Sequence, residues 1–177
     1  MKTYLTYGLA MAIASLLLTL ALFFAGYHSD PDKVQSAQMV LTIGGLAISI
    51  VGIVLGTKAR RSEIPATEPF GYGRALGAGV MIALFSAVFG TIVHLAYTQA
   101  INPDFNEVLL QGQLAKLEAD GVPSSQLDAA EVVMRKMMHP ALQAVFGLVG
   151  GTLYGTVVAL ITSIFLRRRA TDPIPQA

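Results

Sequence analysis

Four long stretches of the chain contain no Lys, Arg, Asp or Glu, and they constrain the fold more than any other feature of the sequence. They are Tyr4–Tyr27, Ala37–Thr57, Ala75–Ala100 and Pro140–Leu166. Each approaches or exceeds the roughly 20 residues that a helix needs to cross about 30 Å of hydrocarbon. Only 13% of the 177 residues are charged, whereas a soluble domain carries about 25%. The sequence therefore predicts an all-α protein: one integral membrane domain over residues 1–177, built as a four-transmembrane-helix bundle.

The basic residues indicate how such a bundle is oriented. Most of them flank one side of the predicted spans, at Lys2, Lys58, Arg60, Arg61, Arg74 and Arg167–Arg169. The segment around Asp30 and the segment 102–139 lie on the other side and carry eight acidic residues. Lys and Arg beside membrane spans remain in the cytoplasm. We therefore expect both termini and the segment 58–74 to be cytoplasmic, and the other two connecting segments to be outside.

The segment 102–139, between the third and fourth spans, shows two helical patterns. Asn102 and Pro103 are typical of a helix start, and Ser125-Gln126-Leu127-Asp128 is typical of a capping box. Apolar residues then recur at helical spacing in both halves. We expect helices over Asp104–Asp120 and Gln126–Met138, forming an amphipathic helical hairpin that lies on the outer membrane surface or caps the bundle.

A glycine-rich segment, Phe70–Gly79, invites comparison with a phosphate-binding loop. A dinucleotide fingerprint requires G-x-G-x-x-G after a strand, but Leu76 stands where the third glycine belongs and no strand pattern precedes it. The Gly-Lys-Ser/Thr sequence of a nucleotide triphosphate loop is also missing. We interpret the segment as the entry of a helix into the membrane, with Arg74 reaching towards lipid headgroups.

Small residues recur every fourth position within the spans. One such stripe contains Gly79, Ala83 and Ala87, and another contains Gly147, Gly151 and Gly155. Stripes of this kind allow two helix backbones in a membrane to approach closely. We expect them to be helix-packing surfaces, with packing inside one chain favoured over packing between two copies.

Three segments carry distinctive motifs: Tyr72-Gly73-x-Ala75-x-x-x-Gly79, Ile101-Asn102-Pro103-Asp104-Phe105 and Phe146-Gly147-Leu148-x-Gly150-Gly151. Together they resemble the domain-of-unknown-function 4199 family. The similarity covers most of the chain, mainly from Phe70 onward. It implies a bacterial protein with four spans, and hence a multi-pass protein of the inner membrane. It implies no reaction, because the family has no assigned activity.

Two polar residues within the spans are candidates for function. His94 lies in the third span and Tyr154 near the middle of the fourth, and ionisable groups are costly at such depths. We expect His94 to be a neutral imidazole bonded to a tyrosine or a backbone carbonyl. The Tyr154 hydroxyl would bond Thr152, Thr156 or a group across the bundle. The alternative is that both residues line a path for a substrate.

A third candidate follows the second helix of segment 102–139. Met134, Met137, Met138 and His139 combine thioethers with an imidazole, which is a donor set that suits Cu(I). Methionine also fills apolar helix faces. We favour that second reading, with no metal and no other cofactor bound.

The sequence contains no pattern that suits an enzyme: the spans hold no acid pair, and neither H-E-x-x-H nor G-x-S-x-G occurs. The expected partners are the lipid bilayer and, as an open alternative, a second copy; nucleotides and nucleic acids are not expected. We hypothesise a structural or interaction protein, and as the alternative a small transporter or channel for a small solute or ion. A polar cavity at the depth of His94 would favour the alternative, whereas dry packing would favour the first hypothesis.

Overall fold

The computed structural model describes residues 1–170, and within them the fold is all-α. The helices are α1 (Lys2–Phe24), α2 (Pro31–Ser62), α3 (Tyr72–Ala96), a π-helical turn η1 (Tyr97–Ile101), α4 (Phe105–Ala119), α5 (Ser124–Met137) and α6 (Pro140–Leu166). The described residues form no strand, and one isolated bridge pairs Phe70 with Arg168. The prediction of an all-α fold is confirmed.

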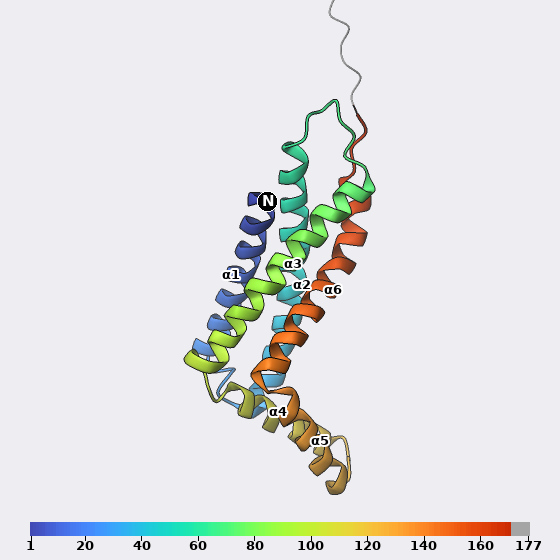
Figure 1. Cartoon of the computed structure of the whole chain (residues 1–177). Coiled ribbons are helices and arrows are strands. Elements are labelled where there is room, and N and C mark those ends of the chain that lie inside the picture. Colours follow the sequence, from blue (N-terminus) through green and yellow to red (C-terminus); the bar gives the residue numbers. More distant parts are fainter. Residues whose placement is uncertain (171–177) are drawn as a thin grey trace, which may run out of the picture.

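Four helices are long and apolar enough to cross a membrane: α1, α2, α3 continued through η1, and α6. They run side by side (Figure 1). The N-terminus, the α2–α3 connection and the end of α6 lie at one end of this bundle, which we call the terminal end. Helices α4 and α5 lie at the opposite end, called here the α4–α5 end.

Helix α2 is longer at both ends than the predicted span 37–57. Asp30 caps its start by accepting a hydrogen bond from the backbone N–H of Asp32, and Pro31 occupies the first turn. Arg60 and Arg61 lie in its last turn, where cations favour the negative end of the helix dipole. In the sequence, charged residues set the limits of the predicted span. In the structure, the helix continues through these charged residues at both ends.

Helices α3 and α6 pack through their small residues. A side-chain carbon added at Gly79 would lie 2.7 Å from Cβ of Ala159, and one at Gly151 would lie 3.1 Å from Cβ of Ala87. One added at Gly155 would overlap Cβ of Ala83. The two small-residue stripes therefore face each other inside one chain, and the helix backbones approach closely because neither stripe projects large side chains.

A second close approach joins α1 to α3. A carbon added at Gly8 would lie 2.7 Å from Cβ of Phe85 and 2.8 Å from the backbone nitrogen of Ser86. The neighbouring core contains Met11, Ile53 and Ile82. The sequence analysis did not single out Gly8, because its four-residue spacing includes only one other small residue, Ala12, and is interrupted at Leu16.

Helix α4 packs against the start of α2. Gln35 donates a side-chain hydrogen bond to the carbonyl of Gly112 (3.1 Å), and a carbon added at Gly112 would lie 2.7 Å from the carbonyl oxygen of Pro31. Helix α5 has no buried residue. Arg135 of α5 donates to both carboxylate oxygens of Glu107 on α4, at 2.8 and 3.0 Å.

Two predicted helix caps are wrong. Helix α5 begins one residue earlier than the predicted capping box, after Pro123, and no side chain caps it. Asn102 does not cap α4 either, because Asp104 precedes that helix and the Asn102 amide is turned towards buried partners instead. Local start signals in the sequence located both helices but did not identify the residues at their N-caps.

Candidate functional site

A polar-lined cavity lies between α1, α2, α3 and α6, in the half of the bundle nearer the α4–α5 end. Its first lobe has a volume of about 220 Å³ and includes Ser15, Ser49, Ser86, Thr91, His94, Gln143 and Tyr154 in its lining. A second lobe of about 170 Å³ shares Ser15 and His94 with the first, and follows α1 and α3 as far as Tyr97.

Small residues create this space. Gly90, Gly147 and Gly151 line the first lobe together with Ala12 and Ala87. At Gly90 an added side-chain carbon would meet no atom within 4 Å, so this glycine faces open volume rather than a packed neighbour. The same glycines that let α3 and α6 approach therefore leave room between that pair and α1.

Two buried oxygen atoms in the cavity wall have no hydrogen-bond partner within the described residues. They are the hydroxyl oxygen of Thr91 and the side-chain carbonyl oxygen of Gln143. The amide nitrogen of Gln143 is satisfied, because it donates to Asn106 at 3.1 Å. A buried polar atom without a partner is costly and rare, so each such atom calls for a ligand or a water molecule.

His94 lines both lobes and is the one ionisable residue that they share. Its backbone carbonyl accepts a hydrogen bond from the Thr98 hydroxyl at 3.1 Å, but within the described part of the chain no tyrosine or carbonyl bonds its ring. The expected tyrosine or backbone partner is therefore absent from the structure. The His94 side chain thus lines the cavity without a hydrogen bond to its ring within residues 1–170.

Tyr154 lines the first lobe and is 44% exposed. The expected bonds to Thr152 and Thr156 do not form, because those hydroxyls donate to the carbonyls of Leu148 (2.7 Å) and Thr152 (2.8 Å) along α6. The structure thus brings Tyr154 and His94 to one cavity without joining them directly.

A buried polar network closes the α4–α5 end of the bundle. Nδ1 of His28 lies 2.6 Å from the hydroxyl of Tyr97, and that hydroxyl accepts a hydrogen bond from the Asn102 amide at 3.1 Å. Phe105 packs against both rings. Burial lowers the pKa of His28 below its ordinary value, because the charged imidazolium would lose its hydration.

The sequence analysis missed this network. His28 lies in a short connecting segment, and its burial depends on α4, which folds over it from 77 residues further along the chain at Phe105. The π-helical turn at 97–101 is a feature frequent at functional sites, but it is visible only in the structure and cannot be read from residue type.

His139, the imidazole of the third candidate, caps a helix. Nδ1 of His139 accepts a hydrogen bond from the backbone N–H of Ala141 at 3.3 Å and so caps α6. Within residues 1–170 no group of three His, Cys, Asp or Glu side chains could hold a metal ion. Met137 is 49% exposed on α5.

The chain belongs to the family described as "Protein of unknown function (DUF4199)", whose family model matches residues 6–168. This result confirms the resemblance seen in the sequence. No curated protein and no solved structure matches the chain.

Proposed function

We propose that this member of the DUF4199 family is a small transporter or channel that binds a small, uncharged polar solute inside the membrane. The observation that carries the proposal is the pair of unpartnered buried oxygens, on Thr91 and Gln143, in the wall of the cavity that contains His94. Inside a bilayer, polar groups without partners are retained chiefly where they serve a substrate path.

The lining of the cavity narrows the class of solute. The lining residues of both lobes include no Asp, Glu, Lys or Arg, so a bound ion would have no compensating charge. The lobes, of about 220 and 170 Å³, hold a few water molecules or one molecule of a few heavy atoms, since a water occupies about 30 Å³. Thr91 and Gln143 offer acceptor oxygens, which favours a solute with hydroxyl or amide donors.

The orientation follows from the basic residues. With the terminal end in the cytoplasm of a bacterial inner membrane, the cavity would lie in the outer half of the bilayer. A solute would then enter from the outside and meet its narrowest contacts near the middle of the membrane, where α3 and α6 pack most closely.

Solute flux into proteoliposomes tests the proposal. We expect vesicles containing the protein to take up glycerol or urea faster than empty vesicles, measured by light scattering after an osmotic step. Thr91→Val, which keeps side-chain shape but removes the hydroxyl, should slow this flux. Thr162→Val is the matched control, because the Thr162 hydroxyl bonds its own helix at Val158 (2.9 Å), away from the cavity.

Protein stability provides a second readout. Replacing an unpaired buried hydroxyl by an apolar group of the same shape is neutral or stabilising. We therefore expect Thr91→Val to preserve or raise the melting temperature while it lowers flux. If the protein gives no flux above that of empty vesicles for any small neutral solute, the proposal is wrong.

A structural or interaction role is the second candidate, and α5 is the feature that favours it. Val132, Val133 and Met137 are each about half exposed, and none of the residues of α5 is buried. Such a helix is suited to lie on the outer membrane surface or against a partner. The chain has no Trp, so Val133→Trp introduces a single reporter; quenching by brominated lipid would place this face in the bilayer, with Asp128→Trp as the solvent-facing control.

A further inference from the structure

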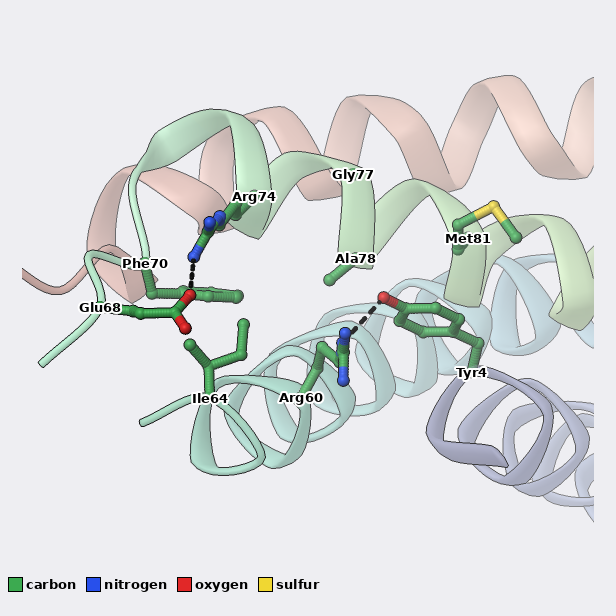
Figure 2. Close-up of a pocket in the computed structure, with 9 residues that line it drawn as sticks. All are labelled: Tyr4, Arg60, Ile64, Glu68, Phe70, Arg74, Gly77, Ala78 and Met81. Atoms are coloured by element: carbon green, nitrogen blue, oxygen red, sulfur yellow. Dashed lines mark hydrogen bonds and ion pairs between the residues drawn. The ribbon is translucent and has the colours of Figure 1, made fainter. Parts of the chain in front are cut away.

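A second cavity, separate from the one at His94, opens at the terminal end of the bundle. Its volume is about 530 Å³, and its walls come from α1, the end of α2, the α2–α3 connection and the start of α3 (Figure 2). We propose that this cavity binds one anionic phospholipid, with the headgroup phosphate between Arg60 and Arg74 and an acyl chain along α3 beside Gly77.

Two arginines supply the anion-binding groups (Figure 2). Arg60 donates through Nε to the Tyr4 hydroxyl at 3.1 Å and through Nη1 to Glu63 at 2.5 Å. Arg74 donates through Nη1 to Glu68 at 3.1 Å and to the carbonyl of Pro69 at 3.0 Å. Within the described residues Nη2 of Arg60, and both Nε and Nη2 of Arg74, have no protein acceptor. These spare N–H groups can bind phosphate oxygens, for which guanidinium geometry is well suited.

The ion pairs of the two arginines are open to competition from an anion. Arg60 is paired with Glu63 and Arg74 with Glu68, and these two carboxylate side chains are 42% and 54% exposed. An exposed ion pair of this kind contributes little, so a phosphate can compete for Arg74 without a large penalty. Further basic residues lie in the last turns of α2, at Lys58 and Arg61, and directly after α6, at Arg167–Arg169.

The apolar part of the cavity distinguishes a lipid from free phosphate. Ile64, Phe70, Ala78 and Met81 form much of its remaining lining. A side-chain carbon at Gly77 would meet no atom within 4 Å, so the surface of α3 is unobstructed at this lining residue and offers a slot for an acyl chain. A free anion would leave this slot empty, whereas an acyl chain would fill it; basic pockets between spans are known to hold anionic headgroups.

The wall of the cavity is fixed by contacts from the end of α6. Nη2 of Arg168 donates to the carbonyls of Ile64 (3.0 Å) and Pro65 (2.9 Å). The backbone groups of Phe70 and Arg168 exchange two further hydrogen bonds, at 2.9 and 2.8 Å. The α2–α3 connection is therefore held in place before a ligand arrives, which lowers the ordering penalty of binding.

Binding of defined lipids to the purified full-length protein in detergent tests the inference. Dioleoyl phosphatidylglycerol carries the anionic phosphodiester with acyl chains, dioleoyl phosphatidylcholine is its zwitterionic counterpart, and inorganic phosphate and glycerol phosphate lack the chains. We expect phosphatidylglycerol to bind most tightly, as measured by native mass spectrometry and by thermal shift. Arg74→Gln should weaken this binding by about tenfold or more, the loss expected for a hydrogen bond to a charged group.

Two further variants separate the site from general charge effects. Arg167→Gln removes one positive charge at the same end but outside the lining, and should leave the affinity within about twofold because exposed charges are screened. Gly77→Leu should weaken binding of the lipid by filling the slot, while Arg74 and its charge remain. Equal losses in Arg74→Gln and Arg167→Gln would overturn the site, as would equal binding of the two lipids. Saturation by inorganic phosphate at the same affinity would show a free-anion site and refute the lipid.

Discussion

The contact between α3 and α6 predicts a graded response to the smallest substitution, glycine to alanine. Within α6, Gly150 and Gly155 differ sharply: a carbon added at Gly150 meets nothing within 4 Å, whereas one added at Gly155 overlaps Cβ of Ala83 and lies 3.4 Å from its Cα. The obstructing atom at Ala83 is fixed to the backbone, so no rotamer change can relieve the overlap. The helices must move apart or shift along each other.

The magnitude follows from two opposing terms. Alanine in a helix interior is favoured over glycine by about 0.8–1.0 kcal/mol, and overpacking of a dense contact costs about 1–3 kcal/mol. Gly150→Ala should therefore stabilise the protein by up to about 1 kcal/mol, while Gly155→Ala should be between neutral and about 2 kcal/mol destabilising. The difference between the two variants isolates the packing term, because the helix-propensity term is common to both.

The difference in stability between the two variants can be measured by unfolding in mixed micelles. The fraction of sodium dodecyl sulfate is increased, and helix content is followed by circular dichroism. We expect the Gly155→Ala midpoint to lie below that of Gly150→Ala by an amount equivalent to about 1–3 kcal/mol. Gly8→Ala should be at least as damaging, because it meets the backbone nitrogen of Ser86 at 2.8 Å. Identical midpoints for Gly150→Ala and Gly155→Ala would refute the close packing of α3 on α6.

Three further outcomes are expected. Topology reporters fused at Lys2 and at Ala177, the latter outside the described residues, should both read cytoplasmic, and an external reading at either end would contradict the orientation. Because the folded-state pKa of His28 is lowered, its contribution to stability is present above about pH 6.5 and is lost as the pH falls; the melting temperature should drop in that range in the wild type and less in His28→Gln. Replacing Met134, Met137 and Met138 by leucine should leave the fold stable, at under about 1.5 kcal/mol per swap, and tight Cu(I) binding abolished by that replacement would instead support a metal site.

The sequence was sufficient to predict the four long apolar helices because a helix suited to a membrane is defined by local composition. Each uncharged stretch corresponds to one helix that is long and apolar enough to cross a membrane. The predicted ends of these helices were less accurate. Helix α2 extends past its charged residues to Ser62, since a helix can continue into the headgroup region, where charges are hydrated and no composition change marks its end.

The cavity could not be predicted, although two of its lining residues, His94 and Tyr154, could be singled out. His94 was notable in the sequence because it is ionisable within an apolar stretch. Thr91 and Gln143 were not notable, since the polar groups of threonine and glutamine usually have hydrogen-bond partners in the protein or face water. Their isolation depends on the spacing of α1 from the α3–α6 pair, and that spacing results from side-chain volumes on several helices together. Polar positions within one span therefore indicate that a site exists, but not which residues share it.

Tyr97 connects the cavity to the network at the α4–α5 end. Its ring lines the second lobe and its hydroxyl lies 2.6 Å from His28, while the side chain is only 1% exposed. A solute that moves along the bundle axis from that end would meet Tyr97 before it reached His94. We expect access from this side to require loss of the His28–Tyr97 contact, because the π-helical turn and the packing of Phe105 hold the ring in place. Replacing His28 should therefore change solute flux as well as stability.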